Sequence, residues 1–187
     1  LMNYWQTGDV GDVFRQNARQ ALRTAEPGFS FNFFDKENET LRNACTEVSS
    51  ELDSDCCNLA SINMGRVQSL EEFADIVELG TKFLICGTLR ADLPYQKVYD
   101  VREATRRLGL GLMGMHEWLI KKGYKYECTP ELHQWLSVYK GVSDKTADAF
   151  ADSLSISRPV AKRAIAPTGS IGILAGTTTG VEPLFAV

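Results

Sequence analysis

The sequence has 187 residues, of which 44% are hydrophobic and 24% are charged, as in an ordinary globular domain. This composition excludes a disordered tail and a fibrous protein, and the length allows a sizeable core without disulfides or metals. The formal net charge of −4, from 24 acidic and 20 basic residues, argues against binding to DNA or to a membrane surface. Because no run of about 18 apolar residues and no signal segment is found, we expect a cytoplasmic protein.

The first part of the chain predicts one helix and two strands. Apolar residues recur at helical spacing through Asp12–Ala25, and Pro27-Gly28 ends the pattern. The alternation in Phe29–Phe34 predicts a half-buried strand, and a polar loop is expected over Glu37–Glu51. The segment Cys57–Met64 predicts a second strand.

Two long helices are expected next. Ser69 and Glu72 form a capping box that begins a helix running to about Cys86. Its apolar stripe consists of Leu70, Phe73, Val77, Phe83 and Leu84. The second helix, Asp100–Lys121, begins with charged residues and becomes almost wholly apolar, which indicates a buried element.

The last part of the chain predicts a third helix and a final strand. The helix begins at Thr129-Pro130, and we expect Gly141 to break it before a further segment. One face of this helix carries Leu132, Trp135, Leu136 and Tyr139. Arg163–Thr168 predicts a strand that leads into a loop rich in glycine and threonine. Because helices and strands alternate and no linker is visible, the fold class is α/β in a single block.

The cysteines raise the question of redox chemistry. They lie at Cys45, Cys56, Cys57, Cys86 and Cys128. An odd number without a secretory context argues against a disulfide framework, and there is no C-x-x-C pair. The set Cys57, Cys128, His116 and His133 has no recognised metal-ligand spacing, so no metal is expected. The thiols are therefore either core filler or redox groups.

Gly109–Gly114 matches the G-x-G-x-x-G pattern of dinucleotide-binding proteins. That pattern is informative only directly after a strand, and here a charged, helical stretch precedes it. An NAD-dependent dehydrogenase is therefore disfavoured. We interpret the glycines as positions where another element passes close to a buried helix.

Three functional groups alternate in the loop before the second predicted strand. Asn43, Cys45 and Glu47 place an amide, a thiol and a carboxylate on one face of an extended segment. Such a set combines a reactive sulfur, a proton acceptor and a group that orients the substrate. Cys57 supplies a second thiol at the start of the strand, so we expect Cys45, Glu47 and Cys57 to share one cavity.

A second candidate site follows the final predicted strand. Small and hydroxyl residues can turn backbone N–H groups toward an anion, and here they are Thr168, Gly169, Ser170 and Ile171. The segment lacks the lysine of a Walker A motif. It predicts a phosphate-binding turn of another kind.

Together, three ordered strings resemble the catalytic large subunit of ribonucleotide reductase. They are NETLRNACTEVSSELDSDCCNLASINMGRV, RRLGLGLMGMHEWL and APTGSIGILAGTTTGVEPLF. The resemblance is closest to the adenosylcobalamin-dependent class II and extends from about Trp5 to Val187. It implies part of a ten-stranded α/β barrel with long helices packed outside, and adenosylcobalamin as cofactor.

The resemblance also implies residue roles. Cys45 would carry a thiyl radical that abstracts the ribose 3′ hydrogen, and Glu47 would accept the 3′ hydroxyl proton. Asn43 would hydrogen-bond the sugar hydroxyls, and Cys57 would be the reducing cysteine. Cys56 departs from the family pattern and faces away from Cys57, as neighbouring strand residues do. The turn over Thr168–Ile171 would hold the substrate phosphates.

Family members are several times longer, so the resemblance implies that residues 1–187 are a partial barrel domain, incomplete at both ends and inactive alone. The implied partners are the remaining N- and C-terminal reductase segments, a ribonucleoside di- or triphosphate, and a thioredoxin-type or dithiol reductant. Two alternatives stay open. One is a non-catalytic nucleotide-binding or assembly module, and the other is a class I reductase piece driven by a separate radical subunit.

Overall fold

The computed structural model describes residues 6–30 and 40–184, and the chain divides into two compact units, Leu1–Thr40 and Leu41–Val187. The first unit contains α2 (Asp12–Thr24), which confirms the first predicted helix. Ala25 ends α2 in the left-handed conformation. Of the predicted strand Phe29–Phe34, residues 31–34 lie outside the described residues, so that element stays a prediction.

The second unit begins with a short hairpin and the first long strand. In the region predicted as a loop, β1 (Leu41–Arg42) pairs antiparallel with β2 (Ser49–Ser50). The predicted strand over Cys57–Met64 is confirmed as β3 (Asn58–Asn63). A single 3-10 turn, η1 (Met64–Arg66), follows it.

The capping box begins α3 (Leu70–Arg90) as predicted. The Ser69 hydroxyl accepts a hydrogen bond from the Glu72 amide at 3.1 Å, and the Glu72 carboxylate accepts from the Gln68 amide. The helix is four residues longer than predicted because the periodicity continues beyond Cys86. Along the predicted stripe, Phe73, Val77 and Leu84 are buried, but Phe83 is 71% exposed, since it lies one position away from the helical repeat.

The predicted helix Asp100–Lys121 is wrong, because three elements occupy this segment. They are α4 (Gln96–Thr105), β4 (Leu108–Met113) and α5 (Met115–Lys121). Arg106, with φ of 43°, ends α4, and Gly114, with φ of 72°, separates β4 from α5. Every residue of β4 is buried, and a continuous apolar run does not distinguish a buried strand from a buried helix.

The glycines of β4 permit close approach on both sides of the strand. β4 pairs in parallel with β3, and on its other side Leu110 bridges Arg163. A Cβ added at Gly111 would lie 2.6 Å from the Ala164 carbonyl oxygen. The close approach inferred from the sequence is therefore present, although the element is a strand. The predicted strand Arg163–Thr168 is reduced to this single bridge.

The longest helix is α6 (Pro130–Ser153), which begins as predicted with the Thr129 hydroxyl accepting from the Leu132 amide. It continues through Gly141, so the predicted break is wrong. One exposed glycine costs a helix only about 1 kcal/mol relative to alanine. The buried residues Tyr139 and Ser143 on either side hold the helix against the core.

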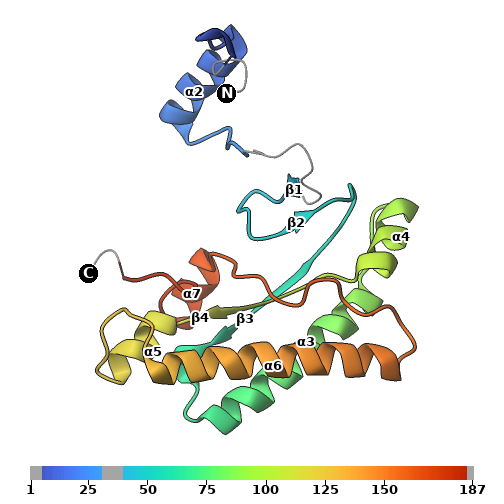
Figure 1. The fold of residues 1–187 in the computed structure, drawn as a ribbon, viewed down its shortest axis with the longest axis vertical. Helices are drawn as coiled ribbons and strands as arrows, with labels where there is room; N and C mark the ends of the chain where they lie inside the picture. Colours follow the sequence, from blue (N-terminus) through green and yellow to red (C-terminus); the bar gives the residue numbers. More distant parts are fainter. Residues whose placement is uncertain (1–5, 31–39, 185–187) are drawn as a thin grey trace. The chain divides into compact units, whose positions relative to one another are not determined.

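The core lies between the helices and the two parallel strands. Figure 1 shows α3 and α6 crossing each other beside β3 and β4, and α3 contacts both strands. The rings of Phe73 and Trp118 each lie 4.9 Å from the ring of Trp135, measured between centroids. The α/β class is confirmed, whereas the described residues form two two-stranded sheets and no closed barrel.

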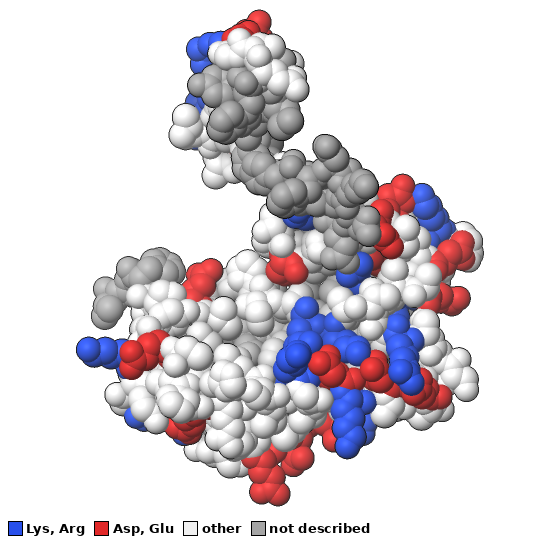
Figure 2. Space-filling model, viewed as in Figure 1, with Lys and Arg blue, Asp and Glu red and all other residues white. Residues whose placement is uncertain are grey.

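Acidic and basic side chains are intermixed on the face shown in Figure 2. Three ion pairs join α6 to the segment that follows it, namely Arg158 with Asp152, Lys162 with Asp148, and Arg163 with Asp144. None of the helices that the structure describes is long and apolar enough to span a membrane.

Candidate active site

A hairpin turn presents the first candidate group. The Asn43 side-chain oxygen accepts from the Val48 amide at 3.2 Å, and the Asn43 carbonyl accepts from the Thr46 amide at 3.0 Å. Thr46 has φ of 66°, which tightens the turn. Cys45 lies at the tip and is exposed, with a free thiol. Asn43 therefore shapes the turn that presents the sulfur.

Glu47 differs from the other polar residues of this turn. Its Oε2 is buried and has no hydrogen-bond partner among the described residues. A buried acceptor without a donor is costly to a fold, so such an atom is a good candidate for binding a hydroxyl group of a ligand. This observation gives the predicted proton acceptor a physical basis that the sequence pattern lacked.

A cavity of about 380 Å³ brings part of the predicted site together. Asn43 and Cys57 both line it. The other lining residues are Leu41, Arg42, Val48, Ser50, Leu52, Asp53, Ser54, Asp55 and Leu59. Cys45 and Glu47 are not among these residues, so the cavity shared by Cys45, Glu47 and Cys57 stays a prediction.

The Cys57 thiol is half-buried at the start of β3. Burial raises its pKa to about 12, Arg107 opposes that rise, and the nearby Asp55, Cys56 and Glu47 add to it. The thiol is therefore protonated at neutral pH. Such a group donates hydrogen rather than acting as a thiolate nucleophile.

Burial also raises the pKa of the Cys56 thiol, with the Asp55 charge as the second cause.

Asp55 is a site residue that the sequence analysis missed. Its carboxylate accepts hydrogen bonds from the hydroxyls of Ser50 at 2.6 Å and Thr105 at 2.8 Å. It also accepts from the Arg107 guanidinium at 2.6 Å and from the Cys56 amide at 2.9 Å. Burial alone would raise the pKa of Asp55, but these hydrogen bonds lower it overall. No sequence spacing indicates this cluster, because Thr105 and Arg107 lie 50 and 52 residues away.

The predicted phosphate turn begins α7 (Gly169–Ala175). Thr168 is buried with φ of 54°, and its hydroxyl accepts from the Gly180 amide at 2.7 Å. Gly169, Ser170 and Ile171 are exposed in the first turn. Thr168 therefore shapes the loop, and the backbone amides that follow it are the candidate donors. None of these four residues lines the cavity beside Cys57.

The remaining cysteines are not core filler. Cys86 and Cys128 are exposed, and all five thiols are free. Among the described residues, no group of three or more His, Cys, Asp or Glu side chains could hold a metal ion. His116 accepts a hydrogen bond from the Leu184 amide at 2.8 Å, so it has a structural role beside the C-terminal segment.

Comparison with known proteins defines the family to which the chain belongs. The family model described as ribonucleotide reductase, barrel domain, matches residues 4–135. The chain therefore belongs to the ribonucleotide reductase family, as the resemblance implied.

Several of the relatives that the chain matches are named as adenosylcobalamin- or vitamin B12-dependent reductases. One, a putative adenosylcobalamin-dependent ribonucleoside-triphosphate reductase of Mycobacterium phage D29, is 30% identical over 92% of this chain and 27% of its own length. A vitamin B12-dependent ribonucleoside-diphosphate reductase of Thermoplasma acidophilum is 28% identical over 90% of this chain and 26% of its own length. The chain thus spans about a quarter of the length of these relatives.

A solved structure shows the same fold. The crystal structure of a B-12 dependent (class II) ribonucleotide reductase superposes with a TM-score of 0.67 at 17% identity. The match covers 91% of this chain and 28% of that one.

Proposed function

We propose that this chain supplies the radical-bearing hairpin and the reducing-cysteine strand of an adenosylcobalamin-dependent ribonucleotide reductase. In this proposal it acts with N- and C-terminal reductase segments beyond the 187 residues. The supporting observation is that Asn43, on the hairpin that carries Cys45 and Glu47, lines one cavity with Cys57.

The exposed Cys45 sulfur fits a radical source that lies outside this chain, because nothing described covers the tip of the turn. Cys45 would hold the thiyl radical, and the chemistry that adenosylcobalamin supplies when bound would be removal of the hydrogen atom from the Cys45 thiol. The sulfur would then take the ribose 3′ hydrogen, so that an S–H bond forms, the C3′–H bond breaks and the unpaired electron passes to C3′.

The neighbouring residues would handle protons and electrons. The unpartnered Glu47 oxygen would accept the 3′ hydroxyl proton, while the 2′ hydroxyl takes a proton from the Cys57 thiol and leaves as water. Cys57 and a second thiol from an absent segment would supply two electrons and end as a disulfide. The second thiol proton would go to C2′, and Cys45 would return its hydrogen to C3′, which restores the thiyl radical. Glu47 would return its proton to the 3′ oxygen. Asn43 would donate from its side-chain nitrogen to the sugar, because its oxygen already accepts from Val48.

The turn at the start of α7 is the proposed phosphate contact. The backbone amides of Gly169, Ser170 and Ile171 would donate to phosphate oxygens, with Thr168 fixing the loop through Gly180. Relatives of both the diphosphate and the triphosphate type match the chain, so both substrate types belong in the assay.

Complementation tests the proposal. The chain is mixed with the N- and C-terminal remainder of a class II reductase, adenosylcobalamin and a dithiol, and deoxynucleotide formation is measured. We expect activity from the mixture, none from the chain alone, loss with Cys45→Ser, and retention with the matched control Cys86→Ser. Unimpaired turnover with Cys45→Ser would refute the radical role. Nucleotide binding without any reduction would instead favour the non-catalytic module.

A further inference from the structure

One buried carboxylate links four parts of the fold around the candidate site. Asp55 contacts Ser50 in β2, Thr105 at the end of α4, and Arg107 just before β4. It lies in the segment that leads to Cys57 and β3, and it also accepts from the Cys56 amide. The side chains of Asp55 and Arg107 are only 5% and 8% exposed.

The contacts of Asp55 have a consequence for the hairpin. The two strands β1 and β2 are only two residues each, which is too short for independent stability. The hydrogen bond from the Ser50 hydroxyl to Asp55 joins the end of this hairpin to the segment before β3. A buried, charge-assisted hydrogen bond holds its partners more firmly than an exposed, neutral one.

From this arrangement we infer that Asp55 is a positioning residue, which holds the Asn43–Glu47 turn in place beside Cys57 and, through its pairing with Arg107, keeps the thiol in a balanced electrostatic environment. This inference rests on the proposed function for its catalytic meaning. The geometry that carries it is independent of activity.

The charged groups that face Cys57 act in opposite directions. Arg107 lowers the pKa of the Cys57 thiol, whereas Asp55 and Glu47 raise it, as does the neighbouring Cys56. Removing the Asp55 charge leaves Arg107 without that partner beside the thiol. The pKa of the Cys57 thiol is then lowered, so a larger fraction is thiolate at a given pH and Cys57 reacts faster.

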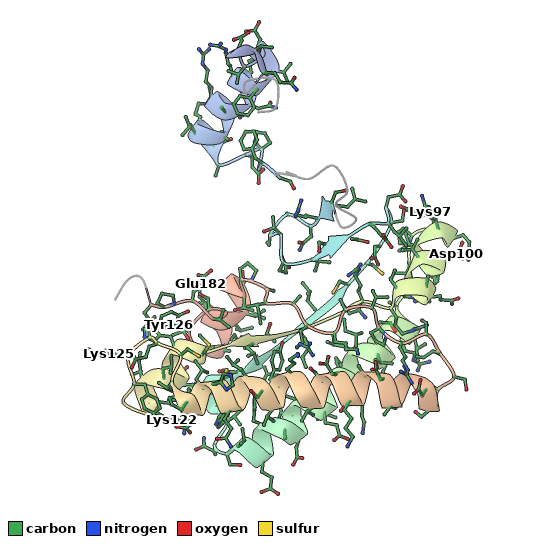
Figure 3. All side chains as sticks on the ribbon, in the orientation of Figure 1. Lys97, Asp100, Lys122, Lys125, Tyr126 and Glu182 are labelled. Atoms are coloured by element: carbon green, nitrogen blue, oxygen red, sulfur yellow. The ribbon has the colours of Figure 1, made fainter. Side chains whose placement is uncertain are left out.

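Asp53 provides a matched control on the same loop. It also lines the cavity, but its ion pair with Lys97, the α4 residue labelled in Figure 3, is mostly exposed. An exposed pair of this kind contributes little to positioning. Asp53→Asn therefore makes the same chemical change as Asp55→Asn at a site without the buried contacts.

The experiment uses the full 187-residue chain and two measurements. Hydrogen exchange is followed in residues 41–50 and in α3 and α6, and alkylation of each thiol by iodoacetamide is followed by peptide mass spectrometry from pH 7 to 10. We expect Ser50→Ala and Asp55→Asn to accelerate exchange in residues 41–50 with α3 and α6 unchanged. Asp55→Asn should also shift the Cys57 profile to lower pH by roughly 0.5 to 1 unit, about three- to tenfold in rate at fixed pH.

Arg107→Gln separates electrostatics from simple loosening. It should shift the Cys57 profile to higher pH, whereas a merely loosened structure would speed alkylation in both variants. If Asp55→Asn changes hydrogen exchange in residues 41–50 and the Cys57 alkylation profile no more than Asp53→Asn does, the positioning role is overturned. If Asp55→Asn unfolds the chain, Ser50→Ala decides through exchange alone, and an unchanged hairpin overturns the inference. Failed complementation of the unmodified chain would count against the proposed function and leave these readouts intact.

Discussion

Alanine substitutions at two glycines should change stability in opposite directions. At Gly111 in β4, a new Cβ would lie 2.6 Å from the Ala164 carbonyl oxygen and 3.3 Å from that of Ala60. Both are backbone atoms of adjacent extended segments, and Ala164 also donates to the Leu110 carbonyl at 3.2 Å. The strand therefore cannot yield without weakening its ladder. Overpacking of this kind costs about 1–3 kcal/mol, so we expect Gly111→Ala to lower the free energy of unfolding by that amount.

Gly141 in α6 is the control for this argument. Nothing lies within 4 Å of a Cβ added there, and the residue is exposed within a continuous helix. Gly141→Ala should raise the free energy of unfolding by about 0.5–1 kcal/mol, because alanine loses less backbone entropy on folding. Urea titration followed by circular dichroism measures both changes. With an m value of about 2–3 kcal/mol/M, the midpoint should fall by roughly 0.3–1.5 M in Gly111→Ala and rise by roughly 0.2–0.5 M in Gly141→Ala. Equal or greater stability of Gly111→Ala would refute the close-approach argument.

Three further outcomes follow from the same contacts. Tyr139→Phe should lower the free energy of unfolding by about 1 kcal/mol in urea titration, because the Tyr139 hydroxyl donates to the Leu110 carbonyl. The loss is no larger because the carbonyl still accepts from the Ala164 amide. An unchanged free energy would show that the Tyr139 bond contributes nothing. Alkylation of Cys57 at pH 8 should be roughly a hundredfold slower than that of the exposed Cys86, since burial raises the pKa of Cys57 to about 12, and equal rates would contradict that burial. Hydrogen bonds hold the pKa of Asp55 below its ordinary value of 3.8. The stabilisation that the ionised carboxylate gives is therefore complete above the pKa of Asp55 in the unfolded chain, and it is lost as the pH falls through the pKa in the folded chain. Below about pH 4, the free energy of unfolding should therefore depend less on pH in Asp55→Asn than in the unmodified chain. Parallel plots of that free energy against pH for the two proteins would contradict this linkage.

The sequence alone predicted the elements that are set by residues close together in the chain, such as capped helices. The capping residues Ser69 and Thr129 mark the starts of α3 and α6, and each makes the expected bond to the amide three residues on. The helical spacing of apolar residues also predicted α2, although no residue of this helix is buried. For the site, the alternation of Asn43, Cys45 and Glu47 predicted an extended segment with three groups on one face. That conformation is wrong, because residues 44–47 form the turn between β1 and β2 and Thr46 has a φ of 66°.

Tertiary contacts decided the rest. Leu108–Met113 is a strand because β3 and the segment near Arg163 hydrogen-bond to its two edges, and an apolar run carries no period that would reveal those neighbours. Gly141 does not end α6, because packing of the helix outweighs one local preference. Asp55 becomes central only when Thr105 and Arg107 reach it from about 50 residues away. A sequence encodes such a cluster as separate polar residues, and only the folded chain removes the water that would otherwise separate them.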